Sequence, residues 1–132
     1  MGKPVLADTC AWIDFFNARA TPLADALEHF LLQGEVYTCG VVTFELVQGV
    51  KSPKDKRQLL AALQGVTSID IRDPLWANAG QLSADLRRAG ITIPFSDILI
   101  ASVALSQGLA VLTVDRHFEQ VPGLTVLKSI KK

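Results

Sequence analysis

Two aspartates of this sequence stand where short apolar runs stop. Asp8 follows the run at residues 5–7, and Asp115 follows the run at residues 109–113. Both runs have the length and composition of buried strands. An open parallel sheet gathers its chemistry in the crevice at the carboxyl ends of its strands, so both carboxylates are candidates for a catalytic or metal-binding acid. A turn or helix-capping role remains the alternative for either one alone.

Two further carboxylates fall on apolar helical faces. Glu45 lies beside the stripe that contains Val41 and Val42, where a glutamate is seldom buried without a partner. The alternative is an acid that reaches solvent from the margin of that stripe. Asp97 opens the most apolar helix expected in the chain. The helix dipole alone would favour an aspartate there, but the apolar stripe that continues from Asp97 directs it toward the edge of the core.

Four carboxylates in one crevice would raise one another's pKa values unless a cation stood among them. A divalent cation meets this need, and a site made only of oxygen ligands suits Mg²⁺ or Mn²⁺. The two histidines, His29 and His117, have no cysteines at ligand spacing, so the sequence offers no zinc site. Carboxylate-bound Mg²⁺ can activate water and clamp a phosphate, which is the chemistry of phosphodiester hydrolysis.

The elements that would carry these acids alternate between strand and helix. Strands are expected over residues 5–7, 36–39, 66–71, 109–113 and 124–127. Helices are expected over residues 12–16, 22–33, 41–48, 53–64, 73–89 and 97–107, with Thr21, Ser52 and Ser96 as N-caps. This alternation predicts an α/β fold: a mostly parallel sheet of these strands, flanked by helices on both faces, in a single domain over residues 1–132.

The composition limits which partners and which cellular compartment we expect for this protein. Thirteen Lys and Arg residues cancel thirteen Asp and Glu residues, so any nucleic-acid contact must come from a local patch. No stretch reaches the roughly eighteen apolar residues of a membrane span, and the features of a signal peptide are missing. Cys10 and Cys39 have apolar neighbours and no CxxC spacing. We therefore expect buried free thiols, no disulfide, no membrane partner and a cytoplasmic protein.

Four motifs carry these acids in order along nearly the whole chain. They are Val5-Leu6-Ala7-Asp8-Thr9-Cys10-Ala11-Trp12-Ile13, Thr43-Phe44-Glu45-Leu46, Ser96-Asp97-Ile98-Leu99-Ile100-Ala101 and Leu112-Thr113-Val114-Asp115-Arg116-His117-Phe118. In this order and at these intervals the chain resembles the PIN-domain ribonucleases, and specifically the VapC toxins of prokaryotic toxin–antitoxin pairs. Cys10 stands where a haloacid-dehalogenase phosphatase would place a second aspartate, which argues against that class.

The resemblance implies an endoribonuclease that depends on Mg²⁺, for which Mn²⁺ can substitute. Asp8 and Asp97 match the most usual direct metal ligands of the family. Glu45 and Asp115 match acids that complete the pocket, where they bind a second ion or orient water. The implied reaction is in-line attack by metal-activated water, which leaves a 5′-phosphate and a 3′-hydroxyl.

Lesser candidates surround the four acids. Thr113 matches a hydroxyl residue that supports the pocket in the family, and Thr9 is expected to hydrogen-bond the Asp8 carboxylate or a bound water. Arg116 and His117 are candidates for contacts with the phosphate backbone, with ordinary surface roles as the alternative. The basic residues at 51–57, like those at 87–88, could guide RNA or could simply form a solvated helix face.

The resemblance also implies protein partners. A VapB-type antitoxin would lay its C-terminal segment over the toxin and block the pocket, and DNA would be contacted only through the antitoxin. We expect this docking surface on an apolar groove of the first helices, around Trp12, Phe15, Phe16, Leu27 and Phe30, with some of these aromatics belonging simply to the core. Homodimers are common in the family, so a homodimer is expected here.

Two other functions compete with this interpretation. One is another Mg²⁺-dependent phosphoesterase on a similar sheet, such as a phosphatase or a DNA nuclease. Glu45 and the interval from Asp97 to Asp115 favour the PIN interpretation over it. The other is a non-catalytic PIN-like module that binds RNA, against which the complete set of acids argues.

Overall fold

One parallel sheet organises the chain. The computed structural model describes residues 3–130. Within them the strands are β1 (Val5–Ala7), β2 (Val36–Cys39), β3 (Thr67–Ile69), β4 (Ala110–Leu112) and β5 (Val126–Leu127). They pair in the order β3-β2-β1-β4-β5, and each neighbouring pair is parallel. The predicted α/β fold with a mostly parallel sheet is confirmed.

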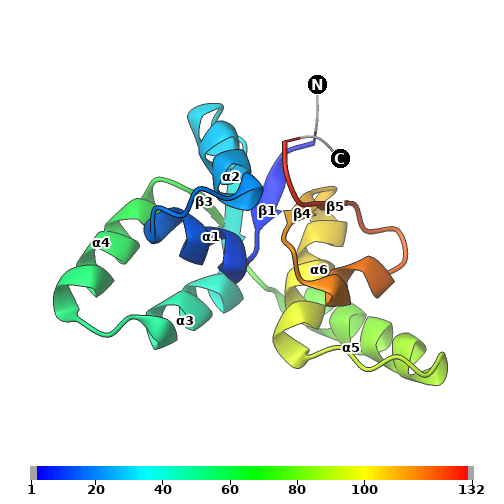
Figure 1. Ribbon diagram of the computed structural model, residues 1–132. Coiled ribbons are helices and arrows are strands. Elements are labelled where there is room, and N and C mark those ends of the chain that lie inside the picture. The colour runs from blue at the N-terminus through cyan, green and yellow to red at the C-terminus, as the bar shows by residue number, and fades with distance from the viewer. Residues whose placement is uncertain (1–2, 131–132) are drawn as a thin grey trace.

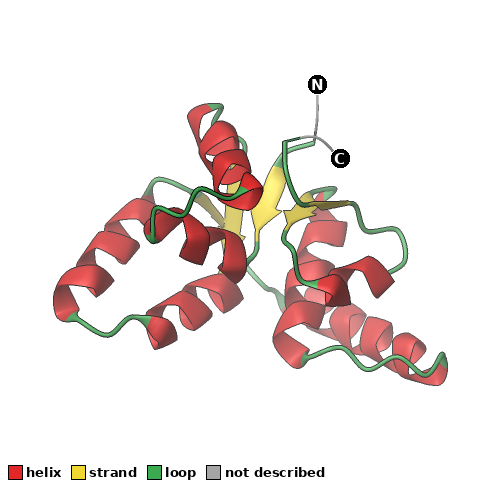
Figure 2. Ribbon diagram, viewed as in Figure 1, coloured by secondary structure: helices red, strands yellow, loops and turns green. Residues whose placement is uncertain are grey.

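Helices lie to both sides of this sheet. They are α1 (Thr9–Phe16), α2 (Pro22–Leu32), α3 (Gly40–Gly49), α4 (Pro53–Gln64), α5 (Asp73–Arg88) and α6 (Phe95–Gln107), with a short 3₁₀ helix η1 at Arg116–Gln120. In Figure 1, α1 to α4 form one group on the left, and α5 and α6 form a second group on the right. The strands run between these groups, as the yellow arrows in Figure 2 show.

The starts of α2 and α4 follow from caps that the sequence predicts. The Thr21 hydroxyl accepts a hydrogen bond from the backbone N–H of Ala24 at 3.1 Å, and Ser52 accepts one from Asp55 at 3.0 Å. Each cap is followed by a proline in the first turn, where the missing N–H costs nothing.

The predicted start of α6 was wrong. Pro94, not Ser96, is its N-cap residue, and the helix begins at Phe95. The carbonyl of Pro94 accepts the first helical hydrogen bond, from the N–H of Ile98 at 3.0 Å. The backbone of Pro94 is extended, with ψ at 147°, and the helix starts directly after it. Asp97 therefore lies within the first turn and not at its very beginning.

The third strand is shorter than the predicted range of 66–71. Its pairing runs from Thr67 to Ile69, opposite residues 37–39 of β2. Since α3 begins at Gly40, directly after β2, no strand remains for residues beyond Ile69 to pair with. The predicted ranges for β4 and β5 were likewise longer than the observed strands.

The core centres on β1, β4 and the middle of α6. The residues of β1 and β4 are fully buried, and α6 is buried without a break from Asp97 to Ala104. Cys10 is half-buried, Cys39 is buried and both are free thiols. None of the helices among residues 3–130 is long and apolar enough to cross a membrane.

The predicted docking surface on the first helices was partly wrong. Trp12 is only 1% exposed, and Leu27 and Phe30 are also buried. These side chains belong to the core because α1 packs against α2. Phe16 remains open to solvent, with its ring stacked on Trp12 at 5.6 Å between centroids.

Candidate active site

The register of the central strands brings Asp8 beside Thr113. Ala7 of β1 is paired with Leu112 of β4, and the backbone N–H of Asp8 donates to the carbonyl of Leu112 at 3.0 Å. The chain extends the sheet on one side of β1 through β2 and β3, then returns to add β4 on the other side. Asp8 and Thr113 thus stand at the point where the strand order reverses, which is where open parallel sheets place their sites.

The Asp8 carboxylate is held on both oxygens. Oδ1 accepts the backbone N–H of Thr9 at 2.8 Å, and Oδ2 accepts the hydroxyl of Thr113 at 2.8 Å. The residue is 5% exposed. Burial raises the pKa of Asp8, and the charge of Glu45 adds to the rise, while the hydrogen bonds from Thr113, Thr9 and Cys10 partly oppose it. The carboxylate is thus oriented, but no lysine or arginine in the described part of the chain pairs with it.

Thr113 links Asp8 to Asp115. Its oxygen accepts the backbone N–H of Asp115 at 2.9 Å while its hydroxyl proton is donated to Asp8. The thiol of Cys10 lies 3.3 Å from the same hydroxyl oxygen and 3.6 Å from Oδ2 of Asp8, to which it donates. Burial and the neighbouring Asp8 charge raise the pKa of the Cys10 thiol, which keeps it a donor. No pattern in the sequence indicated this contact.

Glu45 joins the site through Thr9. The Thr9 hydroxyl donates to Oε1 of Glu45 at 2.7 Å, which ties α1 to α3. The expected hydrogen bond from Thr9 to the Asp8 carboxylate is made by the backbone N–H of Thr9, which leaves its hydroxyl free to bind Glu45. Glu45 is half-buried, as its place beside the apolar stripe of α3 predicts.

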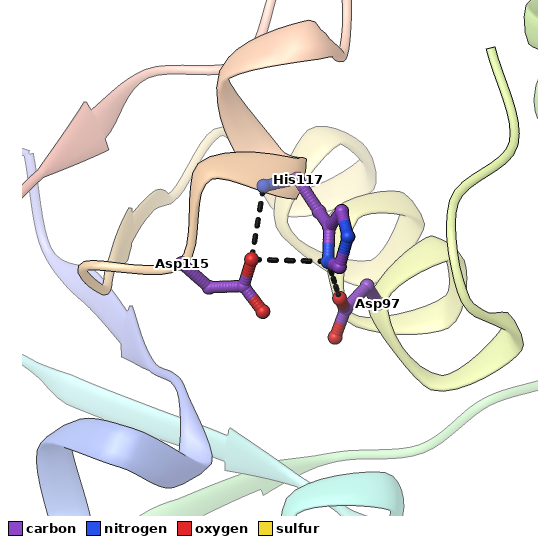
Figure 3. Close-up of side chains that lie close together, drawn as sticks. All are labelled: Asp97, Asp115 and His117. Atoms are coloured by element: carbon purple, nitrogen blue, oxygen red, sulfur yellow. Dashed lines mark hydrogen bonds and ion pairs between the residues drawn. The ribbon is translucent and has the colours of Figure 1, made fainter.

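Asp97 and Asp115 meet at one imidazole, as Figure 3 shows. Nδ1 of His117 lies 3.0 Å from Oδ2 of Asp97 and 3.0 Å from Oδ1 of Asp115. Asp97 reaches this point from α6, and the other two residues come from the turn after β4. Burial, followed by the charges of Asp115 and Asp8, raises the pKa of Asp97 to about 6, although His117 lowers it.

His117, which the sequence suggested only as a phosphate contact, instead lies between two of the acids. Burial lowers its pKa, but the hydrogen bond and charge of Asp97 and the charge of Asp115 outweigh this, so the pKa of His117 is raised. Its backbone N–H also donates to Oδ1 of Asp115 at 2.9 Å, so Asp115 caps η1. The only signal in the sequence was the position of a histidine two residues after a turn aspartate. Arg116, which was named as a site candidate, is exposed.

All four predicted acids therefore lie at the carboxyl edge of the sheet. Asp8 is coupled to Glu45 and to Asp97 by charge, and Asp97 is coupled to Asp115. Among residues 3–130, no lysine or arginine forms an ion pair with any of the four acids. A donor set of carboxylate oxygens with one imidazole nitrogen, in a partly desolvated pocket, fits a divalent cation.

Comparison with known proteins agrees with this geometry. The family model of the PIN domain matches residues 5–124. The chain belongs to the PIN-domain family. The tRNA(fMet)-specific endonuclease VapC of Shigella flexneri is 36% identical over 118 residues, which cover 85% of this chain and 89% of that protein. Ribonuclease VapC11 of Mycobacterium tuberculosis is 25% identical over 129 residues, or 95% of this chain and 96% of that protein.

Solved structures share the fold of this PIN domain. The DNA-bound VapBC of Salmonella typhimurium has a TM-score of 0.78 at 23% identity, over 95% of this chain and 97% of that one. VapBC2 of Rickettsia felis, bound to a promoter DNA fragment, has a TM-score of 0.77 at 21% identity and covers 92% and 96%. The resemblance to VapC-type PIN domains is therefore confirmed.

Proposed function

We propose that this chain is the endoribonuclease toxin of a VapBC-type toxin–antitoxin pair and that it hydrolyses RNA with Mg²⁺, for which Mn²⁺ can substitute. One observation carries the metal-dependent part. Asp8 and Asp97 are 5% and 8% exposed and are coupled by charge, and neither is paired with a described lysine or arginine. Two buried carboxylates in this arrangement need a cation. The relatives named VapC ribonuclease support RNA as the substrate.

Asp8 and Asp97 would be the direct metal ligands, with Glu45 and Asp115 completing the pocket. A bound divalent ion supplies Lewis acidity and lowers the pKa of a water. The chain's own hydrogen-bond donors orient the carboxylates of the site. Thr113 and the N–H of Thr9 fix the plane of the Asp8 carboxylate, and the Thr9 hydroxyl fixes Glu45 at Oε1. Glu45 is thereby placed to orient the attacking water by accepting its proton in a hydrogen bond.

RNA would approach along a surface with little net charge. The basic residues of α4 are exposed and could contact phosphates beyond the cleaved bond: Lys54, Lys56 and Arg57. Lys51, just before α4, lies in the wall of a cavity that also includes Glu45, so a cation stands near the acidic site. Transfer RNA is the first RNA class to assay, because the Shigella relative is named for tRNA(fMet).

The antitoxin would occupy a groove between α1, α3 and α4. This groove encloses about 400 Å³, and its wall includes Ile13, Phe16, Leu46 and Leu59. Because Glu45 also lines it, an antitoxin segment lying there would reach the acidic site and could place a basic side chain beside it. The VapBC structures that share this fold are complexes of toxin and antitoxin, two of them with DNA. DNA contact would come through the antitoxin.

A second copy of the chain would cover the aromatic face formed by Phe44, Trp76 and Phe95. Their exposed fractions are 69%, 46% and 70%, and Trp76 stacks on Phe95 at 6.2 Å between centroids. This leaves on the order of 400 Å² of aromatic surface open, an area typical of an interaction site. The same face holds a hollow of about 560 Å³, so it offers both protruding rings and a place to receive them. A twofold dimer needs such self-complementarity.

The test is a cleavage assay on a panel of three substrates: RNA that includes tRNA, single-stranded DNA and a small phosphate ester. We expect cleavage of RNA alone, dependent on Mg²⁺ or Mn²⁺ and abolished by Asp8→Asn and by Asp97→Asn. Asp25→Asn, which changes an exposed aspartate of α2, is the matched control and should leave cleavage intact. Cleavage of the ester or of DNA in preference to RNA would show another phosphoesterase. RNA binding without cleavage would show a non-catalytic module.

A further inference from the structure

The imidazole of His117 stands at the distance of a metal ligand from its neighbours. Its Nδ1 is 3.0 Å from an oxygen of Asp97 and 3.0 Å from an oxygen of Asp115, and all three donor atoms lie within 4.8 Å of one another. Adjacent ligands of an octahedral ion with bonds of about 2.1 Å are separated by about 3.0 Å. Nδ1 therefore already lies, relative to each of the two oxygens, at the spacing of neighbouring positions in one coordination shell (Figure 3).

A metal ion would satisfy these three donor atoms better than the proton on Nδ1 does. The Nδ1 atom of His117 carries at most one hydrogen, and that hydrogen faces two carboxylate oxygens at equal distance. One N–H cannot direct a full hydrogen bond at both oxygens. A metal ion can bind all three donor atoms at once, since its bonds point in several directions.

Rigid elements hold the three donors. Asp115 and His117 are fixed to each other by the backbone hydrogen bond that starts η1, and Phe118, the next residue, is 1% exposed and anchors this turn in the core. Asp97 belongs to the buried helix α6. The His117 side chain is 42% exposed, so its ring can rotate through the small distance that metal entry requires. The donors are thus preorganised from two separate parts of the chain.

We propose that His117 binds the divalent ion through Nδ1, together with Asp97 and Asp115, and that this nitrogen makes the site favour Mn²⁺ over Mg²⁺. The inference rests on the metal-dependent function proposed above and adds a ligand to it. Mg²⁺ prefers oxygen ligands, whereas imidazole nitrogen binds transition-metal ions more strongly. His117 therefore contributes little to Mg²⁺ affinity and substantially to Mn²⁺ affinity.

The experiment is pulsed electron paramagnetic resonance on the RNA-free protein loaded with Mn²⁺ alone. We expect nuclear modulation from a directly bound histidine nitrogen, which shifts when the protein carries ¹⁵N-labelled histidine. His117→Gln should abolish it. His29→Gln, which alters the other histidine on α2, is the matched control and should retain it. In calorimetry, His117→Gln should lower Mn²⁺ affinity by about tenfold and Mg²⁺ affinity by much less.

The outcomes separate this inference from the proposed function. Mn²⁺ that binds without histidine modulation would overturn the role of His117 and leave the metal-dependent nuclease standing. Equal losses of Mg²⁺ and Mn²⁺ affinity in His117→Gln would overturn the selectivity. A wild-type protein that binds no Mn²⁺ would contradict both proposals. Circular dichroism of each variant shows that a lost signal does not come from a lost fold.

Discussion

The hydroxyl of Thr113 and the carboxylate of Asp8 meet at 2.8 Å across the two central strands. The two residues are 105 positions apart in the chain, yet parallel pairing of β1 with β4 makes them neighbours. The same hydroxyl oxygen accepts the N–H of Asp115. One threonine therefore aligns the acids at the ends of both strands.

Replacing Thr113 by valine tests this link. Thr113→Val keeps the shape but leaves Oδ2 of Asp8 with only the Cys10 thiol and removes the acceptor of the Asp115 N–H. Since Thr113 is fully buried, we expect the free energy of unfolding to fall by about 1–3 kcal/mol. Mn²⁺ affinity should fall as well, because Asp8 loses its orientation. Thr113→Ser retains the hydroxyl and should retain most of both properties. Urea denaturation and calorimetry measure the two effects, and a valine variant with unchanged metal affinity would contradict this role.

The stability of the metal-free protein should fall as pH rises through about 6. The pKa of Asp97 is raised to about 6 in the folded state from its ordinary value of 3.8, so the folded protein binds the extra proton between these values. The stability that this proton contributes is fully present below pH 3.8 and is lost as pH rises through 6. The raised pKa of His117 acts in the same direction at higher pH.

Urea denaturation in EDTA at several pH values checks this prediction. Asp97→Asn should show a weaker decline, and its stability relative to the wild type should grow between pH 4.5 and 7.5. Added Mn²⁺ should restore stability to the wild type above pH 6, where Asp97 is ionised. A wild-type stability that rises over this range by more than in Asp97→Asn would contradict the raised pKa.

The groove between α1, α3 and α4 should govern antitoxin binding. Phe16→Glu places a charge in its apolar wall and should weaken binding of the cognate antitoxin by at least about tenfold, while RNA cleavage by the free toxin persists. Leu32→Glu changes a leucine that is 83% exposed at the end of α2 and serves as the control. Calorimetry with purified antitoxin measures the effect. Equal affinity in the two variants would place the antitoxin elsewhere.

The aromatic face should control self-association. Phe95→Ser removes a ring that is largely exposed, so we expect a monomer in light scattering at concentrations where the wild type is a dimer. Leu32→Ser is the matched control and should remain dimeric. If Phe95→Ser stays dimeric, the dimer forms through another surface.

The positions of the acids could be predicted because they depend on local signals. Apolar runs of strand length ended at Asp8 and before Asp115, and helical spacing placed Glu45 beside an apolar stripe. Because neighbouring strands are parallel, their carboxyl ends lie at the same edge of the sheet, however the helices pack. The caps at Thr21 and Ser52 were equally local and were confirmed.

Features that depend on packing between distant elements could not be predicted. The burial of Trp12 is caused by α2, and the contact of Thr9 with Glu45 requires the approach of α1 to α3. The direction of the His117 ring follows from the 3₁₀ turn that Asp115 caps, and sequence periodicity carries no information about such a turn. The sequence therefore indicated the acids, but it suggested His117 only as a phosphate contact and not as a partner of Asp97 and Asp115.

The most direct test of the central claim is a calorimetric titration of the antitoxin-free protein with Mn²⁺, since it requires no knowledge of the RNA target. We predict micromolar-to-millimolar binding by the wild type and by Asp25→Asn, and loss of that binding in folded Asp8→Asn and Asp97→Asn. Binding that survives in both site variants, or a wild type that binds no Mn²⁺ with or without RNA, would contradict the metal site.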